Sequence, residues 1–168
     1  MAAGSTYTPI STTTLGSAQT SVTLNSFSGY TDLVLIFSGG ENGTNRDFRL
    51  TFNGDTGTNY SATRLIAIST GAESSRSSNA TALEGVVSNN ICTGIYHFMN
   101  YANTTTYKTA IYRIGDPDRR TSAYVGLWRS TSAITSMTFT AESGSTINSG
   151  STFTLYGIAA AYCLIHLN

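Results

Sequence analysis

Hydrophobic and polar residues alternate with a period of two along most of this chain, and clusters of Gly, Asn and Ser separate the alternating stretches. This period matches the β-strand, in which successive side chains point to opposite faces of a sheet. The pattern predicts about eight to ten strands and no long amphipathic helix. The clearest expected strands are Ser21 to Phe27, Tyr30 to Ser38, Asp47 to Phe52, Tyr60 to Ser69, Ile91 to Tyr101, Thr105 to Ile114, Ser122 to Trp128, Ile134 to Ala141 and Thr152 to Ala160.

Two of these stretches also predict how each strand is buried. In Asp47 to Phe52 every second residue is Phe or Leu, which is typical of a strand with one covered face. Leu33 to Phe37 is apolar at every position, which predicts a central strand covered on both faces, either within the domain or by a neighbouring subunit.

The order of these stretches predicts one domain of 168 residues. Many short strands without helices indicate an all-β fold, a jelly-roll-like antiparallel β-sandwich. Residues 71 to 90 are rich in Ser and Asn, so we expect a long polar loop there, with a short strand or turn around Leu83 to Val87. We assign residues 1–19 to an extended N-terminal arm, residues 20–160 to the sandwich and residues 161–168 to an apolar C-terminal tail.

The composition narrows the class of partner. Fifty residues are Ser or Thr, only 18 are charged, and Lys108 is the single lysine. A surface poor in Lys and Glu is typical of a subunit that contacts other proteins. Because the formal net charge is zero, we expect no nucleic-acid partner. The longest apolar stretch, Leu155 to Leu167, is shorter than the roughly 20 residues that a membrane-spanning helix needs, so we expect no membrane partner either.

One loop carries two patterns associated with chemistry. Asp55-Thr56-Gly57 matches the tripeptide of aspartic proteases, but Asn53-Gly54 stands where apolar residues are expected before a catalytic Asp. A simple turn is therefore the favoured interpretation. Oxygen atoms between Asn53 and Asn59 offer a possible calcium site, although the loop supplies one carboxylate and lacks the EF-hand spacing.

The remaining candidates favour structural roles. His97 alternates with Ile95 and Met99 on one strand face, where a single histidine is more often a hydrogen-bonded structural residue than a ligand or base. Trp128 is expected in the core rather than as a platform for a sugar ring. The chain lacks the Gly-x-Ser-x-Gly, His-Glu-x-x-His and phosphate-loop motifs. We therefore expect no enzymatic activity, no metal and no cofactor.

Two further features bear on the cellular compartment. Cys92 and Cys163 have no metal-ligand spacing, and we interpret them as buried thiols, with a disulfide as the alternative. The first residues have neither the basic nor the apolar region of a secretory signal, so we expect synthesis in a cytoplasm.

The order of several segments resembles a family of small virion proteins of tailed bacteriophages, and the resemblance covers residues 7–160. It implies a virion component, and it brings no catalytic residue. Relatives in that family include head decoration and tail-fibre proteins. The segments that carry it are Tyr7-Thr8-Pro9-Ile10, Thr14-Leu15-Gly16-Ser17, Ser21-Val22-Thr23-Leu24, Tyr30-Thr31-Asp32-Leu33-Val34-Leu35, Arg49-Leu50-Thr51-Phe52-Asn53-Gly54-Asp55, Met99-Asn100-Tyr101, Thr106-Tyr107-Lys108-Thr109, Gly126-Leu127-Trp128-Arg129-Ser130-Thr131 and Ser151-Thr152-Phe153-Thr154-Leu155-Tyr156-Gly157-Ile158.

From this resemblance we expect a capsid decoration protein, or cement protein, located in the virion. It would be a homotrimer that binds the major capsid protein and stabilises the assembled head through protein-protein interfaces. The extended arm is expected to add a strand to a neighbouring subunit, and the apolar tail to pack into a subunit interface. The candidate interface residues are Tyr7, Pro9, Ile10, Tyr162, Leu164, Ile165 and Leu167.

Two alternatives stay open. One is a tail-fibre or receptor-binding tip module that recognises host-surface glycans through Trp128 and loop tyrosines such as Tyr60 or Tyr101. The other is a polysaccharide hydrolase, which needs a pair of carboxylates facing a cleft. With nine acidic residues, most of them in turns, the hydrolase is disfavoured.

Overall fold

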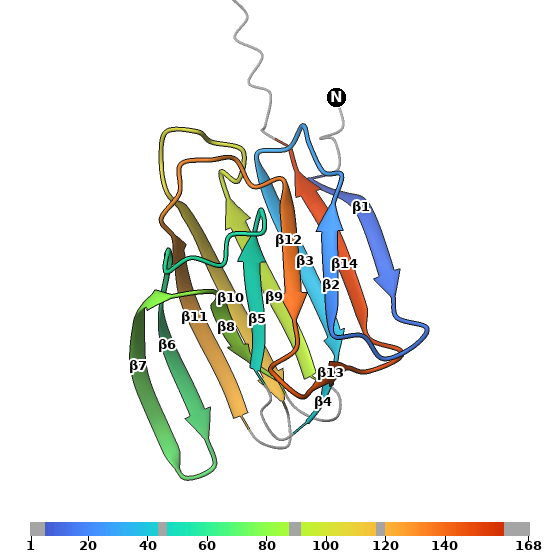
Figure 1. The fold of residues 1–168 in the computed structure, drawn as a ribbon, viewed down its shortest axis with the longest axis vertical. Coiled ribbons are helices and arrows are strands. Elements are labelled where there is room, and N and C mark those ends of the chain that lie inside the picture. Colours follow the sequence, from blue (N-terminus) through green and yellow to red (C-terminus); the bar gives the residue numbers. More distant parts are fainter. Residues whose placement is uncertain (1–5, 44–46, 88–91, 117–119, 160–168) are drawn as a thin grey trace, which may run out of the picture.

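The computed structural model describes residues 6–43, 47–87, 92–116 and 120–159. Every regular element in these residues is a β-strand, and most of the strands form two antiparallel sheets packed face to face (Figure 1). The prediction of an all-β, single-domain sandwich is therefore confirmed.

The larger sheet has eight strands and the smaller has four. In spatial order the larger sheet contains β1 (Tyr7–Thr14), β14 (Thr152–Ile158), β3 (Asp32–Gly39), β9 (Cys92–Met99), β10 (Lys108–Asp116), β11 (Arg120–Trp128), β6 (Tyr60–Ile68) and β7 (Gly71–Ala80). The smaller sheet contains β2 (Ser21–Asn25), β12 (Ser136–Thr140), β5 (Asp47–Phe52) and β8 (Leu83–Val86). A short pair, β4 (Glu41–Asn42) with β13 (Thr146–Ile147), lies at one end of the sandwich (Figure 1).

The strand order is that of a jelly roll to which four strands have been added. The order β1-β14-β3-β9 in one sheet and β2-β12-β5-β8 in the other is the jelly-roll arrangement of two four-stranded sheets. The added strands are β6 and β7, which follow β5, and β10 and β11, which follow β9. All four extend the larger sheet on the side of β9, so its far edge is β7.

The prediction of an extended N-terminal arm over residues 1–19 is wrong in one respect. Its residues 7–14 are extended, but they form β1 and pair with β14 of the same chain, so the sandwich begins there and not at residue 20. The sequence missed this strand because Thr and Ser fill most of it and the alternation of apolar residues is absent. Pro9 lies at a β-bulge, which is where a sheet edge tolerates a residue without an N–H.

The prediction of a long polar loop over residues 71 to 90 is also partly wrong. Gly71–Ala80 forms β7, which pairs with β6 in a hairpin, while Leu83–Val86 forms the short strand that was expected. Nine of the ten residues of β7 are exposed, so its sequence carries no hydrophobic signal. Backbone pairing with β6 is what orders it. Residues 88–90 lie outside the described residues.

The other expected strands are present with shifted ends. The largest shift is the start of β10 at Lys108, because Asn103 forms a turn in which its Oδ1 accepts hydrogen bonds from the backbone N–H groups of Thr105 and Thr106. In β5 the side chains of Phe48, Leu50 and Phe52 are buried, as the alternation predicted. Ile91 and Ala160, the expected ends of two strands, lie outside the described residues.

β3 is a central strand, as predicted, but its two faces differ in burial. It lies between β14 and β9, and Leu33, Leu35 and Phe37 on its inner face have no exposed surface. On the opposite face Val34 is buried, whereas Ile36 is 37% exposed. The second face is therefore only partly covered by the chain itself.

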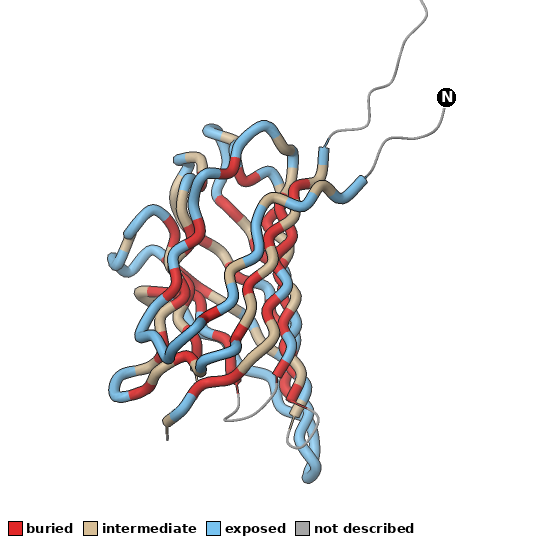
Figure 2. Tube along the Cα trace, turned by 90° about the vertical axis from the view of Figure 1, so that its right-hand side faces the viewer, coloured by how far each residue is buried: buried red, intermediate tan, exposed pale blue. Residues whose placement is uncertain are grey.

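The core lies between the two sheets, where the buried residues gather (Figure 2). Three of its tyrosines, on neighbouring strands, stack in a row. The ring centroids of Tyr96 and Tyr112 are 5.0 Å apart, and those of Tyr112 and Tyr124 are 4.5 Å apart. β8 lies directly on these rings: a Cβ on Gly85 would lie 3.4 Å from the Tyr96 hydroxyl and 3.7 Å from the Tyr112 ring, and at 2.5 Å from Cδ1 of Ile114 it would require that side chain to shift.

A buried acid lies at the end of the sandwich. Glu41 in β4 has no exposed surface, and its Oε1 accepts a hydrogen bond of 2.9 Å from the backbone N–H of Glu142. Burial raises the pKa of the Glu41 carboxyl to about 7, and the negative charges of Asp47 and Glu142 add to the increase.

We therefore predict that stability falls as the pH rises from 4.5 to about 7. In this window folded Glu41 keeps its proton whereas unfolded Glu41 has released it, so the folded state binds more protons. The free energy of unfolding should fall by about 3 kcal/mol across the window and remain low above it. Glu41→Gln should remove most of this slope in urea denaturation at a series of pH values. The exposed control Glu73→Gln should keep it, and an unchanged slope in Glu41→Gln would contradict the prediction.

Candidate interaction surfaces

The face of the larger sheet that points away from the smaller sheet, here called the outer face, carries apolar side chains across many strands. In the strand register Val125 lies opposite Ile111, Ile111 opposite His97, His97 opposite Val34 and Val34 opposite Tyr156. Because directly opposite residues in an antiparallel sheet share a face, these five side chains form one row across the strands.

A second row runs beside the first. It contains Leu65, Ala123, Arg113, Ile95 and Ile36, each opposite the next in the register. Across the two rows Leu65 is 55% exposed, Val125 52%, Ile111 46% and Ile36 37%. Several large apolar residues exposed together on one surface are typical of a site that contacts another molecule.

A shallow hollow of about 240 Å³ lies within this face. It is lined by Ile95, His97, Met99, Ile111 and Arg113, together with Tyr112. The imidazole of His97 has no hydrogen-bond partner in the described part of the chain, so the hydrogen-bonded structural role expected for it is not found. Its ring instead contributes to the lining of the hollow.

The outer face carries few charged side chains. On β3, β9, β10, β11 and β6, the charged side chains that point outward are Arg113 and Asp32. The Oδ1 atom of Asp32 accepts a hydrogen bond of 2.7 Å from the backbone N–H of Asn100, at the rim of the face. Arg113 is therefore the charge that a partner would meet near the centre, and it favours an apolar surface that carries a carboxylate.

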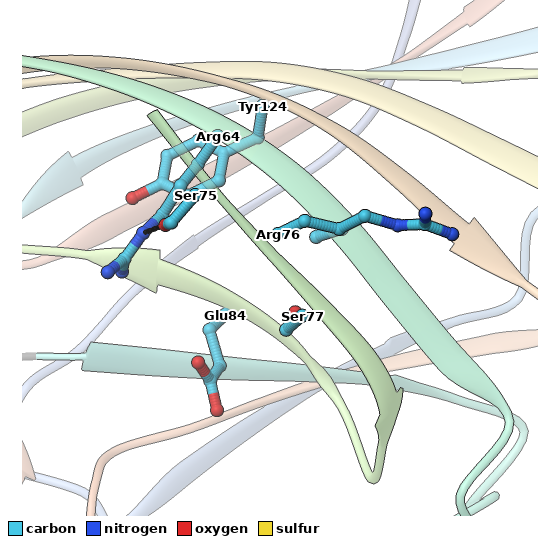
Figure 3. A pocket seen from close by; sticks show the side chains of 7 residues that line it. Arg64, Ser75, Arg76, Ser77, Glu84 and Tyr124 are labelled. Atoms are coloured by element: carbon cyan, nitrogen blue, oxygen red, sulfur yellow. Dashed lines mark hydrogen bonds between the residues drawn. The ribbon is translucent and has the colours of Figure 1, made fainter. Parts of the chain in front are cut away.

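A second candidate surface lies on the inner side of the β6–β7 hairpin, beside the edge strand β8. A hollow of about 240 Å³ is found there, and Figure 3 shows the polar side chains around it. Its lining residues are Ala62, Arg64, Ser75, Arg76, Ser77, Glu84 and Tyr124.

The polar groups of this hollow are only partly paired. The Nε atom of Arg64 donates a hydrogen bond of 2.6 Å to Ser75 Oγ, and the hydroxyl of Tyr124 accepts one of 3.2 Å from the backbone N–H of Val86. The guanidinium of Arg76 points away from the other side chains (Figure 3). The two terminal nitrogens of Arg64 and the carboxylate of Glu84 form no hydrogen bond within the described residues. The hollow therefore offers both donors and an acceptor to a polar ligand.

The interface residues expected from the sequence fall into two groups. Tyr7, Pro9 and Ile10 lie on β1; Tyr7 is 48% exposed and packs edge-on against Tyr156 at 6.2 Å, whereas Ile10 packs partly against the core. Tyr7 thus belongs to the outer face. Tyr162, Leu164, Ile165 and Leu167 lie outside the described residues.

Trp128 is a core residue, so the proposal that it stacks on a sugar is wrong. Only 2% of it is exposed, and its ring stacks on Tyr60, with centroids 6.4 Å apart. Tyr60 and Tyr101, the loop tyrosines proposed for the same role, are also buried. Trp128 points to the same face of β11 as the buried Tyr124, so the expectation that it is a core residue is confirmed.

Asp55 has a structural task in its loop. Its Oδ2 accepts a hydrogen bond of 2.7 Å from the indole N–H of Trp128, and its Oδ1 accepts one of 2.9 Å from the backbone N–H of Gly57. Asn59 Nδ2 donates to the same carboxylate. The bond from Trp128 is the main reason why the pKa of Asp55 is lowered. Because both oxygens face N–H donors, the geometry supports the turn interpretation and gives no support to a calcium site.

Metal-binding clusters and membrane-spanning helices are absent from the described residues. No three His, Cys, Asp or Glu side chains gather there in a group able to hold a metal ion. No helix in this part of the chain has the length and hydrophobicity to cross a membrane. Cys92 is buried, and Cys163 lies outside the described residues, so the structure does not address whether they pair.

The chain was also compared with known proteins. Neither the models of protein families nor the curated protein sequences gave a match.

We predict that Asp55→Ala lowers the free energy of unfolding by about 1 to 3 kcal/mol, because the N–H groups of Trp128 and Gly57 lose a charged acceptor. Thermal and urea denaturation measure this, and Glu73→Ala on the exposed face of β7 is the control. Calcium should raise the melting temperature of neither the wild type nor the variant. A calcium-dependent rise that disappears in Asp55→Ala would restore the calcium interpretation.

Proposed function

We propose that this protein is a structural component of a tailed-bacteriophage particle, and specifically a capsid decoration protein. The resemblance over residues 7–160 suggests the particle, and the jelly-roll sandwich agrees with a structural role. The observation that carries the proposal is the outer face, where two apolar rows lie exposed across the larger sheet.

The proposed mechanism is burial of this face against the assembled capsid shell. Burying a fully exposed Val, Leu or Ile side chain contributes about 1.5 to 3 kcal/mol, and each partly exposed residue of the two rows contributes a share of this to the contact. A protein that binds the assembled shell and not its free subunits stabilises the assembled state by mass action. Arg113 favours a shell surface that carries a carboxylate beside apolar residues.

We predict that the paired change Ile111→Glu and Val125→Glu abolishes co-sedimentation with purified phage heads. Two carboxylates would be buried in an apolar contact, and the exposed positions should leave folding intact. The control is Ser21→Glu, an exposed position on the smaller sheet, which should bind like the wild type. Equal binding of the paired variant would exclude the outer face.

Copy number in the purified virion then tests the class of component. A decoration protein should be present in a simple ratio to the major capsid protein. A few copies per particle would instead place the protein in the tail.

The hollow beside β8 favours a second candidate function, a receptor-binding module that recognises host glycans. Its unpaired groups suit a polyol, because the Glu84 carboxylate accepts from hydroxyl groups and the Arg64 guanidinium donates to them. The Arg64 guanidinium also suits a sugar that carries a carboxylate, because arginine pairs with carboxylates through charge-assisted hydrogen bonds. This site replaces Trp128 in the glycan hypothesis.

If this second function holds, Arg64→Ala should reduce binding to acidic glycans on an array by roughly tenfold or more, since it removes a charge-assisted donor. The matched control is Arg76→Ala, because the Arg76 guanidinium points away from the hollow (Figure 3). Equal losses in both variants would indicate attraction by net charge, and no binding by the wild type would remove the candidate.

A further inference from the structure

The far edge of the larger sheet is an unprotected β-strand. β7 pairs with β6 on one side, and it is the last strand of the sheet in the described residues. Nine of its ten residues are exposed, and its side chains are mostly Ser and Ala. Along the open side of such a strand, backbone N–H and C=O groups are available to pair with another strand.

The other sheet edges differ from β7 in ways that limit pairing. β1 contains Pro9 and a bulge between Pro9 and Ser11, both of which interrupt a ladder. In the smaller sheet the edge strands β2 and β8 have five and four residues. β7 has ten residues without Pro or Lys, and its irregularity is confined to the end near Ala80. Among the described strands it is the edge best suited to backbone pairing.

We propose that β7 pairs with β7 of a second copy of this chain, antiparallel and about a two-fold axis, with Ser75 opposite Ser75 of the second copy. A two-fold axis perpendicular to the sheet makes the pairing antiparallel and uses the same surface on both copies. The small polar side chains of β7 present no steric obstacle, and their polarity favours pairing through the backbone rather than unspecific aggregation.

The charged residues of β7 select this register. Opposite residues must share a face, so residues separated by an even number pair with each other. A register centred on Arg76 or on Glu73 places like charges directly opposite, which destabilises a strand pair. A register centred on Ser74 places Arg76 opposite Ala72, which offers it no hydrogen-bond partner.

The register centred on Ser75 gives both charged side chains a partner. Arg76 lies opposite Ser74 of the second copy, and Glu73 lies opposite Ser77 of the second copy. Each serine hydroxyl is able to pair with the charged group that it faces. Each outer face would continue into that of its partner, so the contact is compatible with the proposed decoration role but does not depend on it.

The test uses single cysteines in a Cys163→Ser background of the full chain. Ser75→Cys should form a disulfide-linked dimer under mild oxidation, because opposite Cα atoms in an antiparallel pair lie within the range of a disulfide. Ser77→Cys is the matched control on the same strand and face; its opposite residue is Glu73, so it should stay largely uncross-linked. Equal cross-linking of both variants, or none by folded Ser75→Cys, would overturn the proposal.

Charged residues introduced at position 75 provide an independent test of the pairing. Ser75→Lys places two ammonium groups opposite each other and should weaken self-association, measured by analytical ultracentrifugation, by roughly fivefold. Ser75→Glu should have the same effect, and an equimolar mixture of the two variants should associate at least as well as the wild type. A mixture that associates no better than either variant alone, or a wild type that stays monomeric at high concentration, would exclude the pairing.

Discussion

A row of stacked tyrosines holds the two sheets of this protein together where the jelly roll has been extended. Tyr96, Tyr112 and Tyr124 come from three neighbouring strands, and their rings lie nearly parallel. The hydroxyl of Tyr112 donates to the carbonyl of Glu84, and that of Tyr124 accepts from the N–H of Val86, so the row also binds the backbone of β8. Stacking and hydrogen bonding thus join β10 and β11, which are added strands, to the same core as the jelly roll.

This arrangement leaves the two sheets unequal. Four strands cannot cover eight, and the smaller sheet covers only the inner face of the larger one. Apolar residues on the outer face, among them Leu65, Ile111 and Val125, consequently remain exposed within the chain. Ser and Thr provide much of the remaining surface, and few charges surround the apolar rows. The same extension produces the β7 edge and the hollow beside β8, and it supplies the exposed Leu65, Ile111 and Val125 of the outer face.

The candidate sites show where reasoning from sequence stops. The Gly- and Asn-rich context of Asp55 indicated a turn residue, and the strand position of Trp128 indicated a core residue, but neither revealed that the indole of Trp128 donates to the Asp55 carboxylate. These two residues are far apart in the sequence, and only folding brings them together. The outer face was missed for a related reason: alternation separates two faces of a strand and does not tell which apolar residue lacks a cover.

The sequence by itself determined the all-β class, the single domain, most of the strands and the faces on which their side chains lie. Those properties follow from a local period of two, which any strand displays wherever it pairs. Tertiary structure decided the strand order, the pairing of β1 with β14 and the formation of β7, because Thr-rich and Ser-rich strands become ordered only when a neighbouring strand completes their backbone hydrogen bonds. It also decided that the larger sheet has an uncovered face and an open edge, since coverage depends on contacts between residues distant in the chain.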